Sequence, residues 1–97
     1  MHVRFSRAAE ADLDDIHDYI AEHNQGAARR IVDALVMAAD QLGDFPFLGR
    51  PGRIEGTREL TVPRTPYILI YVLPDAYHVD IEAIVHTRRE WPPYQDD

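Results

Sequence analysis

Two stretches in the first half of the chain carry apolar residues at helical spacing. In the first stretch these residues recur at intervals of four, three and four positions: Ala9, Leu13, Ile16 and Ile20. Acidic residues occupy most of the positions between them, so the pattern predicts an amphipathic helix. Ser6 is a suitable N-cap for this helix, because its hydroxyl can accept a backbone hydrogen bond from the first turn.

The second stripe has the same spacing and runs from Ala27 to Leu42. Asn24-Gln25-Gly26 separates the two stripes and predicts a break between helices. Gly43 follows the last apolar position, and a glycine there is a common signal for the end of a helix. Two helices joined by such a short turn should form an antiparallel hairpin.

The pattern changes after Gly43. The stretch from Phe45 to Gly52 is rich in proline and glycine, so it predicts an ordered loop, and we expect Phe45 and Phe47 to plug the end of the helical hairpin. Alternating β-branched and aromatic residues then predict strands over 57–62, 67–73 and 77–86, with a turn at Leu73-Pro74-Asp75-Ala76. With a first strand over 3–5, the order is βααβββ. The expected fold is α+β, with the two-helix hairpin packed on one face of a four-stranded, mainly antiparallel sheet.

Alternation also assigns the faces of this sheet. In the last strand we expect an apolar row to meet the helices: Val79, Ile81, Ala83 and Val85. Ile84 and His86 then lie on the opposite, open face. There Ile84 would join three residues of the preceding strand, Ile68, Ile70 and Val72, as an exposed apolar strip. Such a strip normally marks a partner site.

Composition narrows the class of protein. A chain of 97 residues suits one domain over 1–97, because it is too short to fill two independent cores. Cysteine is absent, which excludes disulfides and thiolate metal sites and suits a reducing compartment. No apolar segment resembles a signal peptide or approaches the roughly 20 residues of a membrane span. We therefore expect a cytoplasmic protein that does not contact membranes.

Charge argues against direct nucleic-acid binding. The formal net charge is -7, and all ten basic residues are arginines. Nucleic-acid binders usually present positive surface to the phosphates, so we expect no sequence-specific DNA binding by this chain alone. No zinc signature, phosphate-binding loop or nucleophile elbow occurs, and neither a metal nor a cofactor is expected.

Six segments resemble, in order and spacing, the RelE/ParE family of bacterial toxins. They are Ala11-Asp12-Leu13-Asp14-Asp15-Ile16, Phe45-Pro46, Gly49-Arg50-Pro51-Gly52, Gly56-Thr57-Arg58-Glu59-Leu60, Pro66-Tyr67-Ile68 and the segment from His86 to Trp91. The resemblance extends from about Phe5 to Trp91. It implies the βααβββ fold, a place in a type II toxin–antitoxin pair, and a cognate antitoxin whose C-terminal segment wraps the toxin and covers the apolar strip.

The resemblance implies one of two activities. RelE-like toxins cut messenger RNA on the ribosome with basic residues of the open face, whereas ParE-like toxins poison DNA gyrase by binding it. Of the positions that the ribonucleases use, Arg88 and Tyr94 match. Glu59, Thr61 and Ile68 stand where positive charge is required, and a carboxylate there opposes phosphate binding. The sequence thus favours a gyrase inhibitor, with a ribosome-dependent endoribonuclease as the alternative and a non-toxic member that binds only its antitoxin as a third reading.

Several residues are candidates for the site. If the chain is a ribonuclease, the catalytic candidates are His86, Arg88 and Tyr94, although His86 more simply ends a strand and hydrogen-bonds to the loop or the antitoxin. Arg58 either grips a phosphate or pairs with an acidic residue of a helix. Trp91 and Tyr94 either cover the end of the sheet or protrude to bind a partner. The full set expected to contact the antitoxin or the target is Arg58, Ile68, Ile70, Val72, Ile84, His86, Arg88, Arg89, Trp91 and Tyr94.

Overall fold

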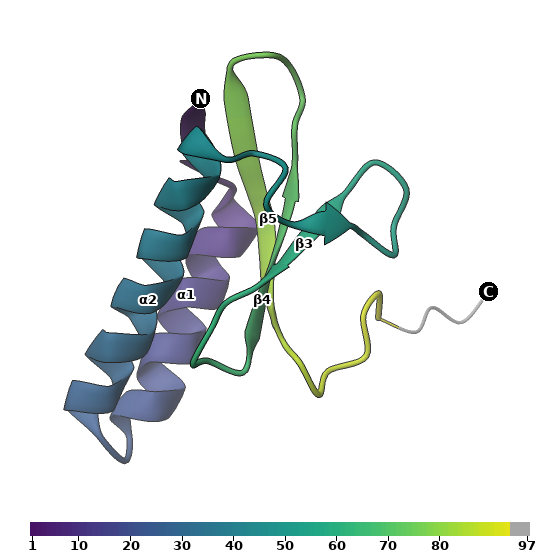
Figure 1. Cartoon of the computed structure of the whole chain (residues 1–97). Helices are drawn as coiled ribbons and strands as arrows, with labels where there is room; N and C mark the ends of the chain where they lie inside the picture. The colour runs from purple at the N-terminus through teal and green to yellow at the C-terminus, as the bar shows by residue number, and fades with distance from the viewer. Residues whose placement is uncertain (94–97) are drawn as a thin grey trace.

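A helical hairpin lies against one face of a five-stranded sheet in the computed structural model, which describes residues 1–93 (Figure 1). The elements follow one another as β1 (His2–Phe5), α1 (Arg7–Ala21), α2 (Gln25–Asp44), β2 (Arg50–Pro51), β3 (Arg58–Thr61), β4 (Tyr67–Val72) and β5 (His78–His86). The α+β class and the packing of the hairpin on one face are confirmed. The expected count of four strands was one too few, because Arg50–Pro51 in the supposed loop pairs with β3 as a short edge strand.

The helix boundaries follow from local capping. The hydroxyl of Ser6 accepts a hydrogen bond from the Ala9 N–H at 3.0 Å, which confirms it as the N-cap of α1. The side chain of Asn24 accepts one from the Ala27 N–H at 2.9 Å and caps α2 in the same way. The break between the helices is therefore shorter than its sequence suggests, because α2 already begins at Gln25.

The strands are arranged in the order β1-β5-β4-β3-β2. β1 runs parallel to β5, and the other neighbours are antiparallel. The first and last strands of the chain thus lie side by side, and β5 is a central strand. The apolar sides of both helices pack on Leu69, Tyr71 and Ile81 in the middle of the sheet, which forms the main core.

A β-bulge divides β5 into two parts. Tyr71 of β4 pairs with Ile81, but the preceding residue Ile70 pairs with Ala83, so Glu82 has no partner in β4. One extra residue in a strand reverses the facing of every residue beyond it. The side chains after Glu82 therefore point to the opposite faces from those that strict alternation predicts.

This reversal corrects the predicted faces of β5. Ile81 packs toward the helices as expected, but beyond the bulge Ile84 joins the main core. Ala83 and Val85 instead pack on the open face with Ile68 and Ile70. The placement of Ile84 on the open face and of Ala83 and Val85 on the helix face was wrong.

Candidate functional site

The centre of the open face is a small second core. Ile68, Ile70 and Val85 form it, and Ala83 and Trp91 pack against it. Only 1% of Ile70 is exposed. The prediction of an exposed apolar strip was therefore wrong, since the chain covers these residues itself. Val72, at the end of β4, is half-buried and lies outside this cluster.

Trp91 is the residue of the C-terminal segment that packs on this cluster. After β5 the chain turns away from the helices, to the opposite side of the sheet (Figure 1), where Trp91 packs on the cluster. The guanidinium of Arg53 donates a hydrogen bond to the Trp91 carbonyl at 3.1 Å. The indole Nε1 is buried and has no hydrogen-bond partner among residues 1–93. Trp91 thus takes the covering role that was one of its two predicted roles, whereas Tyr94 lies outside the described residues.

Glu59 is the one buried charged residue in the part of the chain that the structure describes, and 2% of it is exposed. Its Oε2 accepts a hydrogen bond from the backbone N–H of Arg53 at 2.9 Å. Its Oε1 lies 3.5 Å from Nη2 of Arg50 and 3.4 Å from Nη2 of Arg53. Both guanidinium groups remain exposed while the carboxylate between them is covered, so the negative charge of Glu59 is compensated and the two arginines together leave a net positive charge beside it.

The three positions that a ribonuclease would need to be basic lie next to one another. Glu59 pairs with Ile70, and Thr61 pairs with Ile68 on the adjacent strand. These pairings confirm that Glu59, Thr61 and Ile68 share one face. None of the three carries positive charge, and the guanidinium groups of Arg50 and Arg53 beside them are already paired with the Glu59 carboxylate.

His86 lies on the other side of the sheet, which corrects its predicted place on the open face. Its ring packs edge-on against Tyr67, with the ring centroids 5.4 Å apart. Its Nδ1 accepts a hydrogen bond from the backbone N–H of Arg88 at 3.0 Å. The prediction of a histidine that ends the strand and hydrogen-bonds to the loop is confirmed. Arg88 and Arg89 are exposed in the turn that follows β5.

Arg58 fixes the loop that precedes β2. Its Nη2 donates to the carbonyl oxygens of Gly49 and Phe47, and its guanidinium lies 5.2 Å from the centroid of the Phe47 ring. The predicted pairing with an acidic helix residue was therefore wrong, although the structural role was right. Backbone carbonyls take the place of the carboxylate.

Tyr71 holds the same loop from its inner side. The hydroxyl of the fully buried Tyr71 donates to the Pro46 carbonyl at 2.7 Å and accepts from the Gly49 N–H at 3.0 Å. The polar backbone groups of the loop therefore point inward, and its apolar side chains are directed outward. The exposed fractions are 64% for Phe45 and 71% for Phe47, so the prediction that these rings plug the hairpin was wrong.

An apolar groove opens where the hairpin meets the end of β5. It has a volume of about 490 Å³, and we call it the apolar groove; its lining residues are Asp15, Ile16, Tyr19, Ile20, Ile31, Pro66, Tyr67 and His86. Burial raises the pKa of Tyr67 above its usual value, and the nearby phenol of Tyr19 raises that pKa further. The phenol of Tyr67 therefore stays neutral and adds no charge to the groove. Sequence reasoning missed this site, although the aromatic Tyr19 beside the apolar stripe of α1 was a signal for it.

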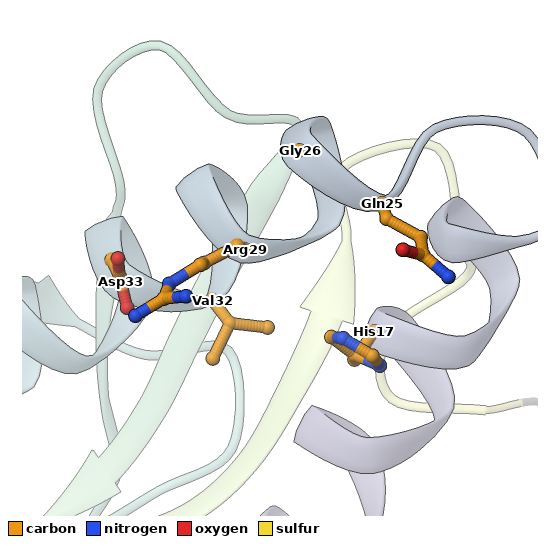
Figure 2. A pocket seen from close by; sticks show the side chains of 6 residues that line it. All are labelled: His17, Gln25, Gly26, Arg29, Val32 and Asp33. Atoms are coloured by element: carbon orange, nitrogen blue, oxygen red, sulfur yellow. The ribbon is translucent and has the colours of Figure 1, made fainter.

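A larger hollow lies on the outer side of the hairpin near the turn between α1 and α2. It has a volume of about 680 Å³, and Figure 2 shows its lining residues: His17, Gln25, Gly26, Arg29, Val32 and Asp33. In this view the guanidinium of Arg29 extends toward Asp33 and away from His17, so the polar groups do not converge on one point. Within residues 1–93 no cluster of three or more histidine or acidic side chains is suited to a metal ion.

Comparison with known proteins identifies the family. Residues 3–91 match the profile of the ParE toxin of type II toxin–antitoxin systems. This chain belongs to the ParE toxin family. Within residues 1–93, no helix of this ParE-family protein has the length and apolar character of a membrane span.

Two relatives are similar to this ParE-family chain over most of their length. Y4kP of Sinorhizobium fredii is 38% identical over 90 residues, which cover 93% of this chain and 92% of Y4kP. Toxin RelE2 of Caulobacter vibrioides is 37% identical over 81 residues, which cover 84% of this chain and 89% of RelE2.

Two solved structures share the fold. One is a chain of the chromosomal ParDE toxin–antitoxin system of P. aeruginosa, with a TM-score of 0.78 and 28% identity. The match covers 89% of this chain and 95% of the ParDE chain. The other is a chain of the toxin–antitoxin complex RelBE2 of Mycobacterium tuberculosis, with a TM-score of 0.66 and 29% identity. The match covers 88% of this chain and 95% of the RelBE2 chain. ParE and RelE names both occur among the relatives, so the two activities have to be separated by the site itself.

Proposed function

We propose that this ParE-family toxin arrests growth by binding DNA gyrase and that a cognate antitoxin neutralises it. The observation that carries the proposal is the buried Glu59 on the open face. A ribonuclease must stabilise the charge that accumulates on the scissile phosphate, and the residues that replace its basic groups are an acid, a hydroxyl and an aliphatic side chain. A toxin that acts by binding needs no such charges.

A ribosome-dependent endoribonuclease is the alternative, and the similarity to toxin RelE2 favours it. Its candidate groups would be His86, Arg88 and Tyr94. The ring of His86 contacts Tyr67 on the helix side, whereas Glu59 lies on the open face, so the histidine and the expected phosphate site are separated by the sheet. Gyrase and ribosomes are both cytosolic, which agrees with the expected location.

The antitoxin is proposed to occupy the apolar groove. The similar ParDE and RelBE2 structures are both named as toxin–antitoxin systems, which supports a protein partner of this kind. The apolar cluster of the open face is covered by Trp91, whereas the groove is open and mostly apolar. A segment with one or two apolar anchors would bury the exposed ring of Tyr19 and the side of Ile20 there.

Tyr19→Ala is expected to weaken antitoxin binding by at least about fivefold, because truncating an aromatic anchor in an apolar site commonly costs more than about 1 kcal/mol. The dissociation constant for the co-encoded antitoxin is the measurement. Tyr77→Ala is a matched control, since Tyr77 is similarly exposed but lies in the turn before β5, remote from the groove residues. Equal losses in the two variants would assign the antitoxin to another surface.

Toxicity is expected to survive Tyr94→Phe, which removes only a hydroxyl group that proton transfer would need. The variant and the wild type are induced without antitoxin, and DNA breaks and the SOS response are compared with cleavage of ribosome-bound messages. DNA damage without message cleavage is the expected result for both. Codon-specific cleavage that disappears in Tyr94→Phe would overturn the gyrase proposal in favour of the ribonuclease.

A further inference from the structure

A small polar recess continues the apolar groove between α1 and β5. It has a volume of about 170 Å³, and its lining includes Asp12 and Arg89. It shares four lining residues with the apolar groove: Asp15, Ile16, Tyr67 and His86. The groove and the recess are therefore one continuous site, which is apolar in one part and charged in the other.

Negative charge prevails in this site. Asp12 and Asp15 contribute two carboxylates to the recess, and Arg89 contributes one guanidinium group. The His86 ring accepts a hydrogen bond at Nδ1 from the Arg88 N–H, an arrangement that requires the neutral imidazole. Along its whole length α1 carries five acidic residues and one basic residue. A partner that enters the site from the side of α1 therefore meets a net negative surface.

The two carboxylates of the recess differ in what they already bind. Oδ2 of Asp12 accepts a hydrogen bond from the Ile84 N–H at 2.9 Å, just beyond the bulge of β5, so the fold itself uses this carboxylate. Asp15 is exposed, and within residues 1–93 its carboxylate has neither a hydrogen bond nor an ion pair. Because Asp15 lines both the groove and the recess, it is the acid that a ligand can reach.

A nearly buried polar residue also opens into the site. Tyr67 is 6% exposed and lines both the groove and the recess. Its hydroxyl group has no hydrogen-bond partner in the described part of the chain, and its pKa is raised only by burial and by the phenol of Tyr19. A neutral phenol can accept a hydrogen bond from a cation as well as donate one. The hydroxyl group of Tyr67 is therefore free to bind a ligand in the site.

These groups together fit the side chain of an arginine or a lysine. The aliphatic stem of such a residue packs on apolar surface while its charged head reaches a polar group, and Ile16 and Ile20 supply the surface. Asp15 supplies the opposite charge, and the rings of Tyr19 and Tyr67 favour a cation. An acidic side chain does not fit, because Asp15 would repel it.

We propose that the antitoxin segment in the apolar groove is basic and places an arginine or lysine side chain against Asp15, beside its apolar anchor. This inference rests on the proposed function in one respect, namely that the antitoxin occupies the groove. The acidic side of α1 then selects the antitoxin by charge. Because Asp15 is exposed at the rim of the site, its contribution should depend strongly on salt.

The test measures the dissociation constant of the full chain for the co-encoded antitoxin after Asp15→Asn, which removes the charge and keeps the size of the side chain. Binding should weaken about fivefold at about 0.1 M ionic strength, where the Debye length is about 10 Å, and change little at about 1 M. Asp14→Asn is the matched control, because Asp14 is an exposed acid of α1 that lines neither the groove nor the recess. It changes the net charge equally and should weaken binding less than about twofold.

A reversal of charge identifies the partner residue. Asp15→Arg should weaken antitoxin binding by at least about tenfold, because it places like charges against each other. Changing each arginine and lysine of the antitoxin to glutamate in turn should reveal one exchange that restores binding to Asp15→Arg and weakens binding to the wild type. The midpoint of unfolding of the free toxin should be the same for Asp15→Arg and Asp14→Arg. If no exchange restores binding, the inference is overturned.

The outcomes separate this inference from the proposed function. If Tyr19→Ala leaves antitoxin binding unchanged, the antitoxin lies elsewhere and both proposals fail. If Tyr19→Ala weakens binding but Asp15→Asn and Asp14→Asn have equal effects, only the basic character of the segment is overturned. Tighter binding by Asp15→Asn would also overturn it, since Arg89 would then receive an acidic group. A dimer of the free toxin that Asp15→Asn dissociates in sedimentation experiments would overturn it as well, because an arginine of a second copy would be the occupant.

Discussion

Gly49→Ala is expected to lower the free energy of unfolding by about 3 kcal/mol, since it combines overpacking with the loss of buried hydrogen bonds. A Cβ atom at this position would lie 2.7 Å from the Tyr71 hydroxyl oxygen and 2.8 Å from the Glu59 carbonyl oxygen. Tyr71 is fully buried and cannot move aside. Both hydrogen bonds of its hydroxyl would be strained, and the loop would lose its anchor.

Gly26→Ala is the control for this prediction. A Cβ atom there comes no closer than 3.4 Å to side-chain atoms of Arg30 and Asn24. Gly26 lies in the first turn of α2, where alanine is favoured over glycine by up to about 1 kcal/mol, so stability should be unchanged or higher. Denaturant unfolding followed by circular dichroism measures both variants. Equal midpoints for the two would show that the loop adapts to the extra methyl group.

Trp91→Ala is expected to lower the free energy of unfolding by about 2 kcal/mol, less than for a fully buried tryptophan because Trp91 is only half-buried. The loss of the indole would uncover Ile68, Ile70 and Val85 on the open face. The variant should bind a hydrophobic dye more strongly and aggregate at lower concentration than the wild type.

Trp91→Phe tests whether the aromatic ring of Trp91 covers the cluster without help from the indole N–H. The indole Nε1 has no hydrogen-bond partner in the described part of the chain, so phenylalanine loses contact area but no hydrogen bond. It should retain most of the stability and the low dye binding. Should Trp91→Ala behave like the wild type in both assays, the segment after β5 would not cover the apolar cluster in solution.

The sequence predicted the parts of the fold that depend on local pattern. The apolar stripes located both helices and Ser6 was correctly predicted as the cap of α1, but Gly43, expected to end α2, lies inside that helix, which runs to Asp44. Alternation placed Glu59 and Thr61 on one face of β3. β5 shows where this reasoning stops. The bulge at Glu82 depends on how β5 pairs with β4, and nothing within the strand itself marks the extra residue.

The candidate site was harder to predict for a related reason. Alternation correctly placed Ile68 and Ile70 together on the open face, but their exposure depended on Trp91, which comes more than 20 positions later and contacts them only in the folded chain. The outward direction of Phe47 likewise depends on hydrogen bonds from Arg58 and Tyr71 to the loop backbone. Such contacts between distant residues leave no periodic signal.

The position of β5 has a consequence for how the toxin folds. β5 is a central strand that pairs with β1 on one side and β4 on the other, and the ion pair of Arg4 with Asp80 joins residues 76 positions apart. Contacts of such long range slow folding, and they cannot form before β5 has been synthesised. Until β5 is in place, β4 has no partner on that edge, and its apolar side chains are exposed in the partly folded chain. A newly released chain therefore passes through a stage in which a binding protein already present in the cell can reach it before the sheet is complete.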